Sequence, residues 1–417
     1  MKVFKFGGAS VKDAKAIKNL LEIVSHFKGE DLVMVISAMG KTTNALEKII
    51  ALRWEGKDVS LDSLNELFDY HDAIVKELFH EGQNFYAEFD RLKSRILRAV
   101  QLPVTENYDF EYDRIIHFGE ILSTTIVSNF LNDNAIENNW LDARKIIRTN
   151  NNYREAKVDW ETSASLVKEH ILSGKYVIQG FIGHTSEGYI TTLGREGSDF
   201  TAGILAYCLD AESVSIWKDV PGMLNADPKY FDEVEKLEKI SYREALELSY
   251  YGASVIHPKT IKPLRNKNIP LYVRSFLNIN EEGTVIQESS ANDTKIPSFI
   301  FKVDQVLISI STRDFSFVVE ENLEEIFGMF NRHKVKINMM QNSALNFSVC
   351  SDNDPRRMPA LIDELKSKFS ILYNEGMELV TIRHYNSETI ERVTLNKRIL
   401  VRQLSRRTAR MVMADLN

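Results

Sequence analysis

QGFIGHTSEGYITTLGREGSDFT, residues 179–201, is the stretch that decides the predicted fold. Residues 176–178 before it have the apolar pattern of a strand, and residues 202–209 after it have the pattern of a helix. Between them lie a glycine-punctuated hairpin and a second turn rich in Thr, Gly, Arg, Ser and Asp. A strand that opens into a glycine-rich loop and continues as a helix presents backbone N–H groups and a positive dipole end to an anion. The stretch therefore predicts a phosphate-binding turn.

Two side chains in the second turn have chemistry that suits such a site. Arg195 offers a planar guanidinium that matches a carboxylate or a phosphate. Asp199 stands where its carboxylate could orient cationic groups or a metal ion. The alternative is a plain hairpin followed by a helix that Ser198 or Asp199 caps. This stretch alone leaves both interpretations open, because glycine-rich loops are common.

The N-terminus repeats the order of strand, glycine turn and helix. Residues 2–6 predict a strand, Gly7 and Gly8 open a turn, and residues 17–24 have helical spacing. Adjacent glycines let the backbone approach a ligand closely, and Lys5 at the strand end could neutralise phosphate charge. The pattern is neither G-x-G-x-x-G nor a Walker loop, which disfavours those families. The alternative places Lys5 on an exposed strand edge.

A third junction follows residues 32–36, a continuous apolar run typical of a parallel strand buried on both faces. It ends in the hydroxyl-rich turn SAMGKTTN, residues 37–44. In an open parallel sheet such turns collect at the carboxyl ends of the strands, where ligands bind. Three junctions of this kind indicate an α/β protein with a ligand site at one sheet edge.

The helical patterns of the first half of the chain contain one unusual pair. Residues 43–100 are almost wholly helical in pattern, and residues 113–131 predict a further single helix. Glycine is unfavourable inside a helix, so Gly119 beside Glu120 in an apolar stretch invites a functional explanation. The alternative for Glu120 is a carboxylate on the helix surface, and His117 is expected to pack or to be solvated. Turn signals at residues 218–229 follow the next predicted strand and could wrap a nucleotide.

Composition limits the class of protein. A chain of 417 residues suggests two or three domains, and a net charge of −7 argues against a nucleic-acid partner. Its two cysteines, Cys208 and Cys350, lie far apart and predict free thiols in a reducing compartment. The N-terminus has no signal-peptide pattern, and no apolar run reaches membrane-spanning length. We therefore expect a soluble, cytoplasmic protein without a membrane partner.

Seven short motifs in these segments resemble those of aspartate kinases, in the same order and across nearly all of residues 1–274. The motifs are Lys5–Val11, Ser37–Thr43, Gly119-Glu120, Thr191–Asp199, Asp219–Gly222, Ala226–Pro228 and His257-Pro258. The resemblance implies an amino-acid-kinase fold, a mostly parallel sheet between helices that holds ATP and an amino acid side by side. It also implies that ATP and L-aspartate react to give ADP and 4-phospho-L-aspartate, the first step toward lysine, threonine and methionine.

The resemblance assigns the phosphate and transfer groups. Phosphoryl transfer needs positioning and neutralisation of charge more than covalent help from the protein. Lys5 and the N–H groups of Gly7, Gly8 and Gly197 suit that role. Asp199 is expected to orient Lys5 at the point of transfer, which makes these two the catalytic residues.

The resemblance also assigns the substrate. By analogy Arg195 should hold the α-carboxylate of aspartate and Glu120 its ammonium group, while Thr43 and Ser198 help to fix it.

On the nucleotide side, Lys218, Asp219 and Lys229 match the family's positions, and Ser10 completes the cofactor-binding set. Mg²⁺ should arrive with ATP and bridge phosphate oxygens, so no dedicated metal site is expected.

The sequence departs from the usual pattern at five positions. The family usually has Thr at Ala9, Gly at Glu196, Thr at Lys218, Arg at Lys229 and Lys at Ser254. A hydrogen bond to a charged group is worth about 1.5–3 kcal/mol, so these changes could weaken ATP binding without abolishing the reaction. Lys218 or Lys259 could replace the charge of the lysine that is missing at Ser254.

The composition changes after residue 277. Residues 278–297 are polar and turn-rich and predict a linker, which separates a catalytic domain at 1–290 from a second region at 298–417. Beyond the linker, strand and helix patterns follow in the order β-α-β-β-α-β, which is a ferredoxin-like unit. The predicted strands are 306–311, 335–340, 345–350, 369–373 and 377–382, and the predicted helices lie around 323–330 and 358–365.

In the resembled family this unit is an ACT domain, which binds an amino-acid effector such as lysine or threonine and pairs with a second copy. Only one complete copy is evident here, and residues 388–417 are shorter than the usual second one. Asn338, Asn342, Ser343 and Ala344 are expected in a turn where lysine-sensitive relatives carry carboxylates. A module for homodimerisation without an effector is therefore an open alternative, and the basic tail is expected to face solvent or another subunit.

Three functions remain in view. The first is an aspartate kinase. The second is a kinase for another amino acid, such as N-acetylglutamate, against which Glu120 and the ACT-like unit argue. The third is an inactive sensor that binds an amino acid through its C-terminal unit, against which the joint presence of Lys5, Arg195 and Asp199 argues.

Overall fold

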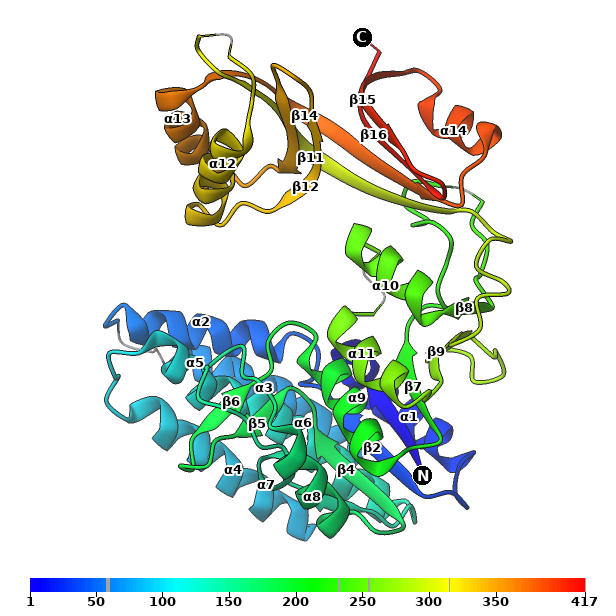
Figure 1. Ribbon diagram of the computed structural model, residues 1–417. Coiled ribbons are helices and arrows are strands. Elements are labelled where there is room, and N and C mark those ends of the chain that lie inside the picture. The colour runs from blue at the N-terminus through cyan, green and yellow to red at the C-terminus, as the bar shows by residue number, and fades with distance from the viewer. Residues whose placement is uncertain (58–60, 232, 254–255, 315, 417) are drawn as a thin grey trace. The chain divides into compact units, whose positions relative to one another are not determined.

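The computed structural model describes residues 1–57, 61–231, 233–253, 256–314 and 316–416 (Figure 1). Ser254, one of the departures noted above, lies outside the described residues. The chain forms two compact units. The first comprises residues 1–223, 238–246 and 255–290, and the second comprises residues 224–237, 247–254 and 291–417.

The first unit is built on an eight-stranded sheet with the order β3-β4-β2-β1-β7-β9-β10-β8. Every neighbouring pair is parallel except β9 with β10. The strands are β1 (Lys2–Phe6), β2 (Leu32–Ile36), β3 (Asn139–Leu141), β4 (Lys175–Gln179), β7 (Ser213–Lys218), β8 (Lys239–Ser241), β9 (Leu271–Ser275) and β10 (Thr284–Gln287).

The register of the central strands brings their carboxyl ends to one edge. Phe6 lies opposite Ile36 in β2 and Trp217 in β7, and Ile36 lies opposite Gln179 in β4. All residues of β2 are buried, and since neighbouring side chains point to opposite faces, both faces of the sheet are covered. The predicted α/β fold with a mostly parallel sheet between helices is confirmed.

Helices surround this sheet. α9 packs against β1, β2 and β7 and against α8 and α11, whereas α6 packs against β2, β3 and β4. The helical elements of the unit are η1 (Gly8–Val11), α1 (Ala14–Ser25), α2 (Thr42–Trp54), α3 (Leu61–Leu78), α4 (Asn84–Gln101), α5 (Tyr108–Ile116), α6 (Phe118–Asp133), α7 (Ala143–Ile146), α8 (Trp160–His170), α9 (Gly197–Leu209), α10 (Tyr242–Tyr251) and α11 (Pro258–Asn266). α10 continues into the second unit from Glu247 onward.

The single helix predicted for residues 113–131 is wrong. The chain forms α5 and α6 instead, which meet at the buried His117. Gly119 therefore lies in the first turn of α6, where a Cβ atom would stand 3.0 Å from the Cβ of Ala38. Close approach to the turn after β2, and not tolerance of an interior glycine, explains this residue.

The linker predicted at 278–297 also needs correction, because it contains β10, an interior strand between β9 and β8. The turn before it is tight. Gly283 has a φ of +75°, and a Cβ atom there would stand 2.1 Å from the carbonyl oxygen of Val273. A four-residue strand after such a turn has too little apolar alternation to be recognised in the sequence.

The second unit contains a six-stranded antiparallel sheet with the order β12-β13-β11-β14-β16-β15. Its strands are β11 (Ser298–Ser311), β12 (Ile337–Asn342), β13 (Phe347–Asp352), β14 (Ser370–Arg383), β15 (Lys397–Leu404) and β16 (Thr408–Asp415), and its own helices are α12 (Glu320–Arg332), α13 (Met358–Lys368) and α14 (Ser387–Thr394). Val306, Ile308 and Ile310 form a core with residues of α12 and α13. The predicted β-α-β-β-α-β order is confirmed for the segment from β11 to β14.

Two long strands connect both halves of this sheet. Residues 305–311 of β11 pair with residues 370–377 of β14, and residues 298–302 pair with residues 379–383. The strands predicted at 369–373 and 377–382 are thus one strand, β14. Its later half, the start of β11, β15, β16 and α14 form a second set of strands with a helix. The expectation of one complete copy missed this set because its strands come from both ends of the region.

None of the helices in the described part of the chain combines the length and apolar character needed to cross a membrane.

Arg53, at the end of α2, joins that helix to the end of α4 and to α5. Its guanidinium donates to the carbonyl oxygens of Val100 (2.7 Å) and Leu102 (2.5 Å) and to the carboxylate of Glu111 (3.2 Å). Both charged side chains are buried, and Glu111 also binds Arg114 at 2.5 Å.

We predict that Arg53→Leu lowers the free energy of unfolding by about 2–4 kcal/mol, because it leaves two carbonyls and part of a buried carboxylate without donors. Urea unfolding at pH 7 measures the change. Lys57→Leu is the matched control, since it breaks the exposed Lys57–Glu55 pair and should cost no more than about 0.5–1 kcal/mol. Equal losses in the two variants would contradict the role of Arg53.

Candidate active site

The aligned strand ends gather most of the predicted site residues of the first unit. Gly7 follows β1, Ala38 lies just past β2, Gly180 follows β4, and Lys218 ends β7. Because these four strands are parallel and in register, the turns that follow them share one edge of the sheet.

A buried ion pair lies at this edge. Lys5 Nζ stands 2.5 Å from Asp199 Oδ1, and Lys218 Nζ stands 3.8 Å from Asp199 Oδ2. Lys5 is 8% exposed and sits in β1, between β2 and β7, so the alternative of an exposed strand edge is wrong. Two lysines around one carboxylate leave a net positive charge that suits phosphate.

The turn after β1 contains two glycines, Gly7 and Gly8, so its backbone carries no side chains at these positions. A Cβ atom at Gly8 would stand 2.8 Å from the carbonyl oxygen of Ala38, and one at Gly7 would stand 3.3 Å from Lys5 Nζ. The turn is tied to the turn after β2 because the Gly40 N–H donates to the Gly8 carbonyl at 3.0 Å. Ser10 donates its hydroxyl to the Trp217 carbonyl at 3.4 Å, which joins η1 to β7.

The stretch at residues 179–201 folds as a hairpin, β5 (Ile182–His184) with β6 (Ile190–Thr192), followed directly by α9. The turn before the hairpin packs on the start of the helix. A Cβ atom at Gly180 would stand 2.4 Å from the Ser198 side chain, and one at Gly197 would stand 2.5 Å from the Phe181 ring. Only glycines fit at these two positions without a shift of the chain.

The start of α9 is open. The helix begins at Gly197 with Glu196 as its N-cap residue and without a side-chain cap, so the alternative in which Ser198 or Asp199 caps it is wrong. Within the described residues, no hydrogen bond is recorded for the N–H groups of Ser198 and Asp199. Uncapped N–H groups beside Lys5 complete a place for an anion.

The backbone conformation of Glu196 explains why the family usually has glycine at this position. Its φ of +53° is left-handed, a conformation that glycine adopts freely and that costs other L-residues about 1–2 kcal/mol. Glu196 Oε2 is also buried without a hydrogen-bond partner. The neighbouring Arg195 is exposed, and it forms no ion pair within the part of the chain that the structure describes.

Glu120 is buried, which rules out the alternative of a surface carboxylate. Its Oε1 accepts a hydrogen bond from the Ala38 N–H at 3.3 Å, and its Oε2 is buried without a partner. Burial raises the pKa of this carboxyl to about 8, and the hydrogen bond from Ala38 offsets only part of that rise. An orphaned carboxylate oxygen of this kind is prepared to accept a cationic group.

The remaining predicted residues are placed less closely. Thr43 is half-buried in the first turn of α2, and its neighbour Thr42 lies with Oγ1 3.4 Å from His71 Nε2. Asp219 is exposed directly after Lys218. Lys229 lies in the segment 224–237, which folds with the second unit.

No sequence motif indicated the role of Asp113, a buried carboxylate in α5. It accepts hydrogen bonds from the N–H groups of Arg154 and Thr192, both at 2.9 Å, and from Thr192 Oγ1 at 2.7 Å. Asp113 therefore holds the end of β6, from which Gly194 and Arg195 follow. Its partners are distant in sequence, so no local motif could have revealed it.

Among the described residues, no three His, Cys, Asp or Glu side chains cluster as a metal site would require.

A parallel sheet whose strand ends collect a buried lysine–carboxylate pair, bare glycine turns and an open helix start defines a protein that binds phosphate-bearing small molecules. The chain belongs to the amino acid kinase family, whose model matches residues 1–275.

Within this family, the chain is similar in sequence to aspartokinases. Lysine-sensitive aspartokinase 3 of Escherichia coli is 29% identical over 393 residues, which cover 91% of this chain and 86% of that protein. A bifunctional aspartokinase/homoserine dehydrogenase of Arabidopsis thaliana is also 29% identical, but this chain spans only 42% of its length. The resemblance to aspartate kinases is confirmed.

Solved structures agree with this result. E. coli aspartokinase III in complex with aspartate and ADP superposes with a TM-score of 0.79 and 26% identity, covering 99% of this chain and 96% of that chain. The same enzyme with lysine and aspartate gives a TM-score of 0.83 and 26% identity, covering 99% and 95%.

Glu120 makes the stability of this protein depend on pH. Because its pKa is raised, the folded protein keeps a proton that the unfolded chain loses between pH about 4.5 and about 8. Stability is therefore lost as the pH rises through that window. Glu120→Gln removes this loss.

We predict that the melting temperature of the Gln variant relative to the parent rises steadily from pH 5 to pH 8.5. The gain in the free energy of unfolding should be on the order of 4 kcal/mol larger at pH 8.5 than at pH 5, since the pKa rises from 4.5 to about 8. Scanning calorimetry across this range measures it. A difference that stays constant with pH would contradict a raised pKa.

Proposed function

We propose that this chain is an aspartate kinase, which transfers the γ-phosphoryl group of ATP to the side-chain carboxylate of L-aspartate. The products are ADP and 4-phospho-L-aspartate, at the first step toward lysine, threonine and methionine. The observation that carries the proposal is the buried Lys5–Asp199–Lys218 cluster beside an open helix start. The E. coli relative that holds aspartate and ADP supports it.

The reaction requires one bond to form and one to break. A carboxylate oxygen of aspartate attacks the γ-phosphorus, and the bond from that phosphorus to the β,γ-bridging oxygen breaks, so that ADP leaves. Lys5 neutralises charge on the transferred group, and Asp199 fixes Lys5 through the 2.5 Å ion pair.

Gly7 and Gly8 supply further N–H donors from the turn after β1. The predicted donor role of Gly197 needs correction, because its N–H already donates to the Gly194 carbonyl at 3.0 Å. The N–H groups of Ser198 and Asp199 at the open start of α9 take that role.

The amino acid is held by complementary charges. Arg195, which is exposed and without an ion pair in the described residues, binds the α-carboxylate. Glu120 accepts the ammonium group on its orphaned Oε2, and a cation there favours the ionised form of this carboxyl. Thr43 and Ser198 fix the remaining polar atoms of the substrate.

Lys218 and Asp219 bind the nucleotide, with Ser10 bracing the first turn against β7. The assignment of Lys229 to the nucleotide rests on the resemblance alone, because Lys229 folds with the second unit. Charge on the phosphate oxygens would be neutralised in part by a Mg²⁺ ion bound together with ATP. Asp219 is exposed and has no ion pair among the described residues, so it suits such a cation through water.

We further propose that residues 1–290 form the catalytic domain and that residues 298–417 form an ACT-like region through which two copies of the chain form a homodimer. The proposed location of the protein is the cytoplasm. Lysine or threonine is the candidate effector, since one E. coli structure holds lysine. Asn338 and Asn342 do not lie in the expected turn, because both are in β12. There Lys302 Nζ donates to Asn338 Oδ1 at 2.8 Å. Ser343 and Ala344 are in the turn and carry no charge, so a module without an effector is the alternative to a lysine or threonine site.

A kinase for another amino acid is the second candidate. For a substrate such as N-acetylglutamate, whose amino group is acylated and carries no charge, the orphaned Glu120 Oε2 disfavours it.

Release of ADP, coupled to NADH oxidation, tests the proposal with Mg-ATP and L-aspartate, each omitted in turn. Aspartate-dependent turnover supports an aspartate kinase, and a decrease on addition of lysine or threonine supports a working effector site. ATP binding without turnover would point to another amino acid or to a sensor.

Arg195→Ala should raise the KM for aspartate by about 10- to 100-fold, because a charge-assisted hydrogen bond to the α-carboxylate is lost. The KM for ATP should change by less than about threefold. Initial rates with each substrate varied separately measure both constants. Arg91→Ala, an exposed arginine in α4, is the control and should change neither. Equal effects on both constants would remove Arg195 from the α-carboxylate.

A further inference from the structure

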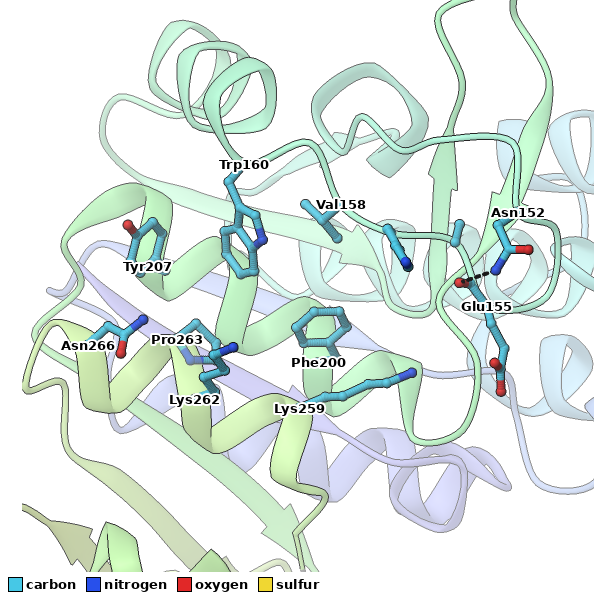
Figure 2. Close-up of a pocket in the computed structure, with 12 residues that line it drawn as sticks. Asn152, Glu155, Val158, Trp160, Phe200, Tyr207, Lys259, Lys262, Pro263 and Asn266 are labelled. Carbon is cyan, nitrogen blue, oxygen red and sulfur yellow. Dashed lines mark hydrogen bonds between the residues drawn. The ribbon is translucent and has the colours of Figure 1, made fainter. Parts of the chain in front are cut away.

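A second hollow lies in the first unit, outside the groups assigned to the reaction (Figure 2). It measures about 720 Å³, within the range of small-molecule sites. Its walls come from the loop before α8, the start of α8, one side of α9 and one side of α11. The lining residues are Asn152, Glu155, Ala156, Lys157, Val158, Trp160, Phe200, Tyr207, Lys259, Lys262, Pro263 and Asn266.

The hollow and the candidate active site are built on the same helix. Ser198 and Asp199 are buried at the start of α9, whereas Phe200 and Tyr207 of that helix line the hollow. The loop before α8 is joined to the hairpin of β5 and β6 by a hydrogen bond, which the Ala156 N–H donates to the Thr192 carbonyl at 2.9 Å. The two sites are therefore adjacent but separate.

Aromatic rings form one wall. Trp160 is 36% exposed although it is large and apolar, and its ring centroid lies 5.1 Å from that of Tyr207 and 6.2 Å from that of Phe200. Both contacts are edge-to-face, with interplanar angles of 74° and 67°. Figure 2 shows these rings around one hollow, with Pro263 beside them. Such a wall favours a planar ring as ligand.

Three lysines also line the hollow, and Figure 2 shows Lys262 close to Pro263 and Lys259 extending toward Glu155. Lys157, Lys259 and Lys262 are exposed, and within the described chain none has an ion pair or a hydrogen bond through its ammonium group. Glu155 is the single acidic residue in the lining, and Figure 2 places it at the far end from Tyr207. Lys259 and Lys262 are three residues apart on α11 and so share a face of that helix. The charge is complementary to an anion.

We propose that this hollow binds a small planar aromatic molecule that carries a carboxylate or a phosphate group. The ring packs on Trp160, Phe200 and Tyr207, and the anionic group pairs with Lys259 and Lys262. A second copy of the chain is a poorer occupant. A symmetric contact centred on this face would bring the same unpaired lysines together.

Titration calorimetry on the full chain tests the proposal, with 2-naphthoate and 2-naphthyl phosphate as anionic probes and 2-naphthamide as the neutral one. Saturating ADP and aspartate are present throughout, so that the candidate active site is blocked. We expect one equivalent of an anionic probe to bind, and the neutral probe to bind at least about tenfold more weakly. The tighter of the two anionic probes identifies the anionic group.

The double variant Lys259→Gln with Lys262→Gln should weaken anionic binding by at least about tenfold. Lys15→Gln with Lys18→Gln, which has the same spacing on the exposed face of α1, is the matched control and should bind as the parent does. No saturable binding, or binding that the first double variant leaves unchanged, would overturn the proposal. A change of oligomeric state in that variant by sedimentation would also overturn it, in favour of a second copy.

Discussion

The ion pair between Lys5 and Asp199 is the interaction on which the candidate site depends. It joins β1, in the middle of the parallel sheet, to the start of α9, and both side chains are almost fully buried. Burying two charges costs several kcal/mol per ion before their attraction is counted, so such a pair adds little net stability. Its value lies in position, because it fixes an ammonium group at the place where the strand ends meet the open helix. The glycines around it let the turns that follow β1, β2 and β4 and the start of α9 pack closely together.

Two further charged residues near this edge of the sheet, Lys218 and Glu120, are held in different ways. Lys218 reaches Asp199 from β7, whereas Glu120 stands in the first turn of α6 with one oxygen orphaned. The two carboxylates differ in environment. Asp199 is flanked by lysines, whereas the pKa of Glu120 is raised to about 8 by burial. An orphaned buried carboxylate is destabilising in the empty protein, and a cationic substrate group would remove that penalty. Glu120 therefore lowers the stability of the empty protein, and the same oxygen would stabilise a bound cationic group.

Much of the first unit could be predicted because its strands are buried on both faces and read as apolar runs, as residues 32–36 do. The glycine turns after them were equally visible, and so were the candidate residues that they carry. Long-range contacts decided the rest. The break at His117, the interior strand β10 and the role of Asp113 depend on partners far away in sequence. The continuity of β14 was hidden by the polar residues 374–376 in its middle.

The two long strands of the second unit impose an order on how its chain assembles. The start of β11 pairs with residues 379–383, so this ladder must wait until all the residues between them have been synthesised and brought together. The contiguous set from residue 305 to residue 377 can form its local pairs first. Until β16 arrives, the later half of β14 is an unpaired strand edge that is prone to association with other chains. Slow, late closure of this half is the kinetic cost of a sheet whose two parts share their central strands.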